Sequence, residues 1–243
     1  MRALSLTFIF AMGWVLWSGG CEALANGDGP DLPEGYSLLY SQDFESENAI
    51  DDFEFTDPAE WRLAEKKGTR ALEFTGTGKY RPKVRSPNTI ALLTSRVFGD
   101  FILEANLLQT GREYGHRDMC LFFGFTDPSK YYYVHIATKA DPNAHNIFVV
   151  NDVPRTNIAR KTTEGIDWGQ DQWHKVRLVR KIAEGTVAVF FDDMTQPLMV
   201  AEDTTFGVGG IGFGSFDDAG MIDNINIWGP PTFFEKKEPP AGE

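Results

Sequence analysis

Residues 115–151, GHRDMCLFFGFTDPSKYYYVHIATKADPNAHNIFVVN, decide the fold. Three short apolar runs in this stretch, at residues 119–125, 131–137 and 146–150, are typical of β-strands. The connections between them, TDPSK and TKADPNAH, each contain an Asp-Pro pair, and such pairs start turns because proline fixes φ and aspartate bonds back to the backbone. The stretch therefore predicts three strands joined by two turns.

The middle run, YYYVHIA, has two chemically different faces because side chains alternate across a strand. Tyr132, Val134 and Ile136 share the face that we expect to pack in the core. The other face carries Tyr131, Tyr133 and His135, and we expect it to point to solvent.

Similar patterns continue on both sides of this stretch. Residues 173–181, WHKVRLVRK, alternate, and a tight turn at 183–185 leads into TVAVFFD, which predicts a hairpin. The glycines of GGIGFGSF (residues 209–216) suit a strand packed closely against another backbone. About eleven or twelve short strands and no long helix predict one all-β sandwich domain at residues 36–229.

The two ends are expected to lie outside this domain. Arg2, the apolar run 3–17 and the small-residue site at 23–25 are typical of a signal peptide, residues 1–25, because the run is shorter than the ~20 residues of a membrane span. A bacterial lipoprotein box ending at Cys21 is the competing interpretation. Either one predicts a secreted or periplasmic protein, and the Pro-rich charged tail, 230–243, is expected to be disordered.

Charge and cysteine content exclude several classes of function. The 243-residue chain has a formal net charge of -12, which argues against a nucleic-acid partner because phosphates would be repelled. No later run is long and apolar enough for a transmembrane segment. Cleavage would leave Cys120 as the one cysteine, and inside an apolar strand we expect it to be a small buried hydrophobe.

The order of motifs resembles a known superfamily. FGDFILEANL is followed by the His/Arg-containing aromatic strand, then WHKVRLVR, VAVFFDD, GGIGFGSFDD and IDNINIW. This order resembles the concanavalin A-like lectin/glucanase superfamily, and within it the secreted bacterial 3-keto-disaccharide hydrolase domains. The resemblance implies a jelly-roll β-sandwich of two antiparallel sheets. HRDMCLFFGF and IDNINI depart from the pattern of the keto-glycoside domains, so function must be argued from the site.

Polar and aromatic residues of the central strands predict a carbohydrate or polysaccharide partner. Sugars present apolar ring faces and many hydroxyls, which aromatic rings together with Arg, Asn, Asp and His can satisfy. The predicted ligand-binding residues are Arg117, Asp118, Tyr131, Tyr133, His135, His145, Asn146 and Arg155. Non-catalytic glycan recognition is the main hypothesis.

Two alternatives stay open. One is a carbohydrate-active enzyme, either a keto-glycoside hydrolase or a polysaccharide lyase, for which Arg117, Tyr131, Tyr133 and His135 supply the residue types of proton transfer and carboxylate neutralisation. The E-x-D-x-x-E pattern of laminarinase-like sandwiches is absent, and the catalytic residues are unknown. The other alternative is a cell-envelope module that binds protein.

Metal binding is a separate question. The spacing of His116, His135 and His145 matches no zinc-ligand pattern. QDFE near the first strand and IDN in the last resemble the paired ends of carbohydrate-binding sandwiches, where calcium takes oxygen ligands from both termini. That resemblance predicts a structural calcium on Asp43, Glu45 and Asp223, and no other cofactor.

Overall fold

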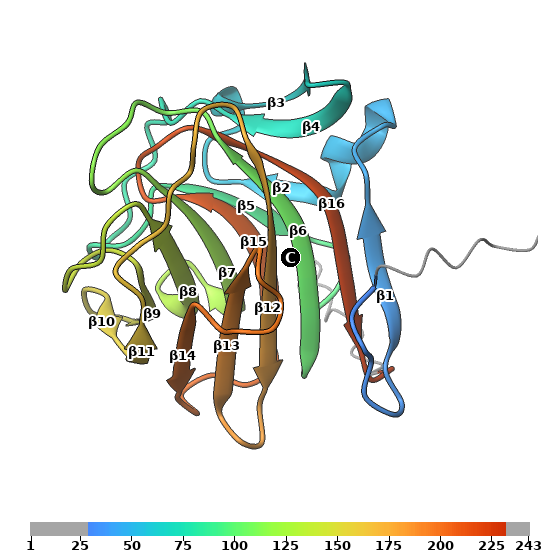
Figure 1. Ribbon diagram of the computed structural model, residues 1–243, viewed down its shortest axis with the longest axis vertical. Coiled ribbons are helices and arrows are strands. Elements are labelled where there is room, and N and C mark those ends of the chain that lie inside the picture. Colours follow the sequence, from blue (N-terminus) through green and yellow to red (C-terminus); the bar gives the residue numbers. More distant parts are fainter. Residues whose placement is uncertain (1–28, 232–243) are drawn as a thin grey trace, which may run out of the picture. The chain divides into compact units, whose positions relative to one another are not determined.

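The computed structural model describes residues 29–231. They form two antiparallel sheets that face each other as two layers (Figure 1). Nine strands make the first sheet, in the spatial order β11 (Ala159–Thr162), β14 (Met199–Glu202), β13 (Thr186–Phe191), β12 (Trp173–Lys181), β6 (Phe101–Gln109), β16 (Gly220–Gly229), β4 (Thr69–Phe74) and β3 (Trp61–Lys66), with β1 (Ser37–Gln42) also paired to β16.

The second sheet has seven strands, in the order β10 (Thr156–Asn157), β9 (Asn146–Asn151), β8 (Lys130–Ala137), β7 (Asp118–Asp127), β15 (Gly210–Ser215), β5 (Thr89–Leu93) and β2 (Phe53–Phe55). Two short 3-10 helices, η1 (Glu47–Asp52) and η2 (Pro58–Glu60), are the helices of the described part of the chain. The predicted all-β sandwich is confirmed. The predicted signal peptide and lipoprotein cysteine, and residues 232–243 of the tail, lie outside the described residues.

The main core lies between the two sheets. Tyr132, Val134 and Ile136 of β8 belong to it and are fully buried, so the predicted alternation of this strand is confirmed. The hairpin predicted around 183–185 is also present, because β12 pairs with β13 from Val176 to Lys181. Burial of these apolar side chains is the main favourable term that holds the layers together.

The expectation that Tyr131, Tyr133 and His135 face solvent is wrong. They do lie on the opposite face from Tyr132, but their exposed fractions are 1%, 0% and 3%. The side chains of this outer face of the seven-stranded sheet form a second apolar cluster. It contains Cys120, Phe122, Tyr131, Tyr133 and Phe148.

Residues 75–88, here called the covering segment, close over part of this cluster. Val84 packs against it, the Arg85 carbonyl accepts a hydrogen bond from the Arg155 backbone N–H, and the Asn88 N–H donates to the Phe216 carbonyl. These backbone bonds tie the covering segment to the edge of the outer face. The polar run KYRPKVRSPN gives no periodic signal of this role.

Several edge strands give only weak signals in the sequence. β3 lies at one edge of its sheet and is only partly buried, and β10 and β11 lie in the polar stretch between β9 and β12. Edge strands show weak hydrophobic alternation because only part of each face is buried. Within residues 29–231, no helix is long and apolar enough to cross a membrane.

The glycine-rich strand β15 packs closely against β5, as the sequence predicts. A Cβ on Gly212 would lie 2.7 Å from the Ala91 carbonyl oxygen, and one on Gly214 would lie 2.0 Å from the Thr89 carbonyl oxygen. Both distances are shorter than van der Waals contact, so β15 can keep its place beside β5 only without these side chains.

Gly214→Ala is therefore expected to lower the free energy of unfolding by more than about 3 kcal/mol, because backbone atoms must move to admit the methyl group. Gly207→Ala is the matched control, since its Cβ would meet its nearest neighbour at 3.8 Å. Chemical denaturation of both variants measures the difference. Equal stability of the two would contradict the close approach of β15 and β5.

Candidate functional site

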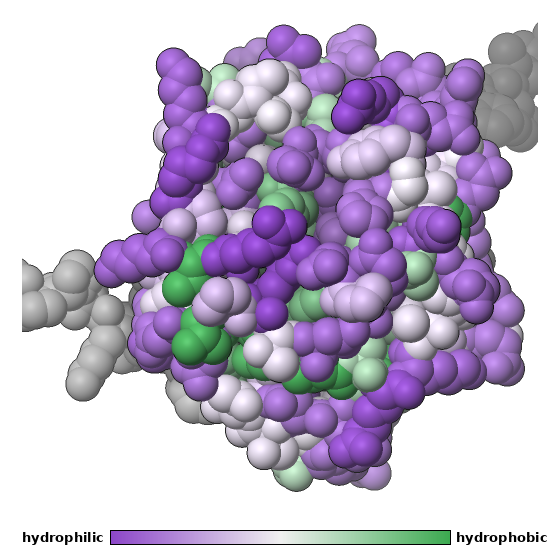
Figure 2. Space-filling model, turned by 90° about the vertical axis from the view of Figure 1, so that its left-hand side faces the viewer, coloured by the Kyte–Doolittle hydropathy of each residue, from purple (hydrophilic) through white to green (hydrophobic). Residues whose placement is uncertain are grey.

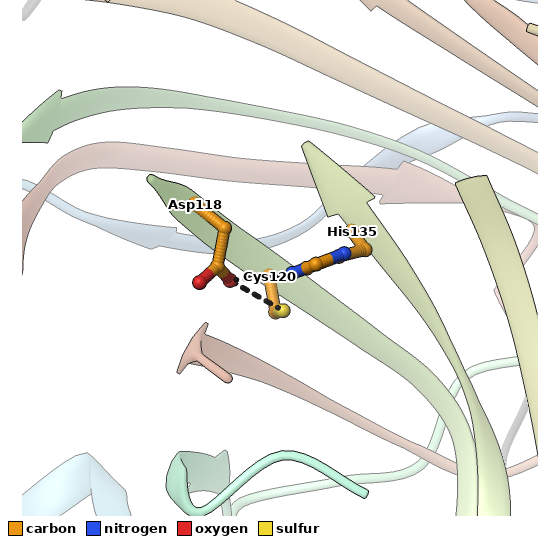
Figure 3. A group of neighbouring side chains, drawn as sticks. All are labelled: Asp118, Cys120 and His135. Carbon is orange, nitrogen blue, oxygen red and sulfur yellow. Dashed lines mark hydrogen bonds and ion pairs between the residues drawn. The ribbon is translucent and has the colours of Figure 1, made fainter. Parts of the chain in front are cut away.

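Three chemically active side chains meet on the outer face of the seven-stranded sheet (Figure 3). Asp118 and Cys120 are two residues apart on β7 and so point to the same side, and His135 on β8 is the direct cross-strand partner of Cys120. Cys120 Sγ lies 3.2 Å from Asp118 Oδ2, and His135 Nε2 lies 3.2 Å from the same oxygen. All three residues are buried.

Asp118 is fully buried but well supplied with donors. Its Oδ1 accepts from the Ser215 hydroxyl (3.0 Å), and its Oδ2 accepts from the Phe216 N–H (2.9 Å) and the Cys120 thiol. Burial alone would raise the pKa of this carboxyl, yet nearby His135 and the donated hydrogen bonds hold it below its ordinary value. We infer an ionised Asp118 around which the 215–218 turn is wrapped.

The pKa of Asp218, in the same turn, is shifted in the opposite direction. Asp218 Oδ2 accepts from the Asp118 backbone N–H (2.9 Å) and the Tyr114 hydroxyl (2.8 Å). Burial, followed by repulsion from the Asp118 carboxylate, raises the pKa of Asp218 to about 7. Burial and Asp118 raise the pKa of Asp217 as well. An ionised Asp118 and a protonated Asp218 therefore lie side by side at pH values below about 7.

A cavity of about 190 Å³ opens above Asp118 and His135. We call it the Asp118 cavity. It is lined by Arg85, Tyr114, His116, Asp118, His135, Asn143, Arg155, Phe216 and Asp217. Arg155 forms one wall. Its guanidinium lies 4.3 Å from the centre of the Phe216 ring and donates to the Tyr133 hydroxyl at 3.0 Å. His116 lies at the exposed rim, where its Nε2 is 2.6 Å from Asp141 Oδ2.

The structure brings together only some of the predicted ligand-binding residues. Asp118, His135 and Arg155 line the Asp118 cavity. Tyr133 lies behind it as the partner of Arg155, and Tyr131 is buried in the cluster beneath.

The other three predicted residues are engaged with backbone groups. Arg117 donates to the carbonyls of Gln109 and Gly169. His145 Nδ1 accepts from the Ala137 N–H, and burial lowers the pKa of His145 to about 4. Asn146 donates to two backbone carbonyls through its amide. Their hydrogen bonds hold the loops around the site in place.

Sequence reasoning missed five lining residues, Arg85, Tyr114, Asn143, Phe216 and Asp217, and it considered His116 only as a zinc ligand. The five come from the covering segment, from the loop before β7, from the loop between β8 and β9 and from the β15–β16 turn, far apart in the chain. The sequence offers one signal, the adjacent acidic pair Asp217-Asp218. It does not show that Asp118 lies beside this pair in the folded protein.

The predicted calcium ligands lie at a different place, where β4 and β16 meet. Thr69 Oγ1 lies 2.7 Å from Asp223 Oδ2 and 3.3 Å from Glu45 Oε1. Burial raises the pKa of Asp223, and the charges of Glu45 and Asp43 add to the effect. Oxygen ligands with mutual repulsion suit a hard cation, so these residues fit calcium in chemistry, and calcium here stays a prediction.

A larger hollow of about 510 Å³ lies farther along the outer face of the same sheet. Its lining is mostly apolar and includes Phe55, Tyr80, Leu92, Arg96 and Phe125. Seen from the side of β9–β11, the surface is mainly hydrophilic, with apolar side chains in small patches (Figure 2). We favour the Asp118 cavity as the site because charged and polar groups converge there.

Comparisons with known proteins establish the fold. No protein-family model and no curated protein matches the chain. Among solved structures, the carbohydrate-binding module CBM66 from Bacillus subtilis matches with a TM-score of 0.51 and 15% identity, over 72% of this chain and 93% of that one. The chain has a concanavalin A-like jelly-roll fold.

Two further structures agree with this fold. Domain 4 of AbnA, a GH43 extracellular arabinanase from Geobacillus stearothermophilus, in complex with arabinotriose, matches with a TM-score of 0.51 and 12% identity over 81% of this chain and 94% of that one. Winged bean acidic lectin, complexed with methyl-α-D-galactose, matches with a TM-score of 0.50 and 11% identity over 79% of this chain and 98% of that one. Identities this low show the fold alone, and these three structures do not support the narrower keto-disaccharide hydrolase resemblance.

The raised pKa of Asp218 predicts a pH-dependent stability. The folded-state pKa of about 7 exceeds the ordinary 3.8, so ionising Asp218 costs folding free energy. The free energy of unfolding should fall as pH rises from about 4 to about 7, by on the order of 2 kcal/mol once the ~4 kcal/mol that such a shift represents is reduced for solvent screening. In chelator-treated protein, Asp218→Asn should remove this decline, because an amide oxygen can still accept both hydrogen bonds.

The exposed Asp51→Asn is the control, and denaturation at several pH values is the measurement. An unchanged decline in Asp218→Asn would show that another group causes it.

Proposed function

We propose that this protein recognises carbohydrate and that the sugar binds in the Asp118 cavity. The observation that carries the proposal is the gathering of planar hydrogen-bonding groups around one aromatic ring. Arg85 and Arg155 both lie over Phe216, with guanidinium-to-centroid distances of 5.5 and 4.3 Å. The rim adds Asp217 and Asn143, both exposed.

These groups match the two sides of a sugar. Neighbouring hydroxyls accept from guanidinium N–H groups and donate to a carboxylate such as Asp217, and charge-assisted bonds of this kind are stronger than neutral ones. The half-buried ring of Phe216 and the ring of Tyr114 offer apolar contact to C–H groups. The volume of about 190 Å³ is below the ~300 Å³ at which pockets for drug-sized ligands begin. We therefore expect the end or a short branch of a glycan to enter.

The fold comparisons support this class of ligand without identifying it. The matched module, arabinanase domain and lectin are described as carbohydrate-binding or as bound to a sugar. Their shared fold raises the prior for sugar recognition, but the site must carry the claim.

A second candidate is a carbohydrate-active enzyme, a keto-glycoside hydrolase or a polysaccharide lyase. It is favoured by the neighbouring carboxyls Asp118 and Asp218, whose pKa values their surroundings move in opposite directions. Such a pair supplies an acid and a base at one pH. Asp118 is fully buried and Asp218 nearly so, which limits direct contact with a substrate, so we rank recognition first.

Titration calorimetry tests the proposal. Soluble neutral and acidic polysaccharides and their oligosaccharides, including arabinan, xylan, galactan and alginate, are titrated into the protein, and each mixture is assayed for new reducing ends or unsaturated products. Arg85→Ala and Asp217→Asn are expected to weaken binding at least ~10-fold, because each loses a charge-assisted hydrogen bond.

Arg96→Ala is the matched control, an exposed arginine in the larger apolar hollow, and it should bind as the wild type does. Binding by no sugar of the panel, or equal affinities of the Arg85 and Asp217 variants and the wild type, would contradict the proposal. Turnover that is lost in Asp218→Asn would favour the enzyme.

A further inference from the structure

The floor of the Asp118 cavity contains a polar side chain whose hydrogen bonding is incomplete. His135 has an exposed side-chain fraction of 4%, and within residues 29–231 neither of its ring nitrogens has a hydrogen-bond partner. Nε2 lies near Asp118 Oδ2, at 3.2 Å, but without hydrogen-bond alignment. A buried imidazole nitrogen without a hydrogen-bond partner costs free energy. A ligand bound to Nε2 would remove this cost.

The atoms around this imidazole are those of a transition-metal site. Asp118, Cys120 and His135 each offer one ligand atom, and these three atoms all lie within 4.8 Å of one another. In tetrahedral zinc sites with bonds of about 2.0–2.3 Å, neighbouring ligand atoms are ~3.3–3.8 Å apart. The Sγ–Oδ2 and Nε2–Oδ2 distances are both 3.2 Å, so small shifts of the side chains would reach that spacing.

We propose that Asp118, Cys120 and His135 bind one Zn²⁺ ion at the floor of the Asp118 cavity. Sulfur, imidazole and a single carboxylate favour zinc over calcium, which takes six to eight oxygen ligands. Zinc binding would displace the Cys120 thiol proton to solvent, and the resulting thiolate and the Asp118 carboxylate would neutralise the ion, so the occupied site carries no net charge. The Ser215 hydroxyl on Asp118 Oδ1 (3.0 Å) orients the carboxylate from outside, as supporting hydrogen bonds do in metal centres.

The fourth coordination position would open to the cavity, because Asp118 and His135 line it. Asp217 could complete the set from the protein, since it lines the cavity and its carboxylate lies within 4.8 Å of that of Asp118. Three protein ligands with one open position are typical of zinc sites that also bind a small ligand. The zinc proposal stands independently of carbohydrate recognition and is tested with the metal alone.

The test uses the full chain with Cys21→Ser, so that Cys120 is the only thiol. Chelator-treated protein is titrated with Zn²⁺ by calorimetry and with Co²⁺ by absorption spectroscopy. We expect one ion per chain, a Kd at or below about 1 μM, and the sulfur-to-cobalt charge-transfer band with the intense visible bands of four-coordinate cobalt. Cys120→Ala and His135→Gln should weaken zinc binding by at least ~100-fold, because changing residues that only support metal ligands already weakens binding by up to that factor. Cys120→Ala should also lose the charge-transfer band.

His116→Ala is the matched control, since it removes a histidine of the same cavity that is not in the ligand set, and zinc affinity should be unchanged. Circular dichroism and thermal unfolding verify that each variant is folded, and Cys120→Ser replaces Cys120→Ala if the latter does not fold. Cobalt binding without a sulfur band in the protein with Cys120 intact, or equal zinc affinity in the Cys120 variant, would overturn the proposal.

Discussion

One buried carboxylate, that of Asp118, organises the outer face of the seven-stranded sheet. It is fully buried, and it binds the Ser215 hydroxyl and the Phe216 N–H of the β15–β16 turn. Removing an ionised group from water is costly unless donors replace the water, so these contacts must persist for the domain to fold as it does. The position of the turn, and with it Phe216 and Asp217 at the cavity, follows from this requirement.

Asp118 also sets the charge states around it. Its negative charge contributes to raising the pKa values of Asp217 and Asp218, after burial as the larger cause. With burial, it keeps the Cys120 thiol protonated, since the pKa of Cys120 lies well above its ordinary value. One carboxylate thus links the packing of the sheet, the turn that closes the cavity and the chemistry of the cavity floor.

The sequence predicts the layers better than it predicts the surface. Alternation in β8 and the glycines of β15 depend on neighbours along the chain, and both are confirmed. The burial of Tyr131 and Tyr133 depends on the covering segment, which lies over 40 residues earlier and has no periodic pattern. Arg117 and Arg155 look alike in the sequence, yet only Arg155 reaches the cavity, because Arg117 is held by the carbonyls of Gln109 and Gly169. Contacts between residues far apart in the chain leave no local pattern in the sequence.

The most direct test of this account is a carbon-13 NMR titration of the aspartate side-chain carboxyls in chelator-treated protein, with the Asp118 signal assigned from Asp118→Asn. We expect the Asp118 signal to remain that of a carboxylate at pH values below 3.8, the ordinary pKa of aspartate, while its hydrogen-bond donors stay in place. An Asp118 carboxyl that is protonated at neutral pH would contradict the account, because an uncharged group could neither hold the turn as an ion nor raise the pKa of its neighbours.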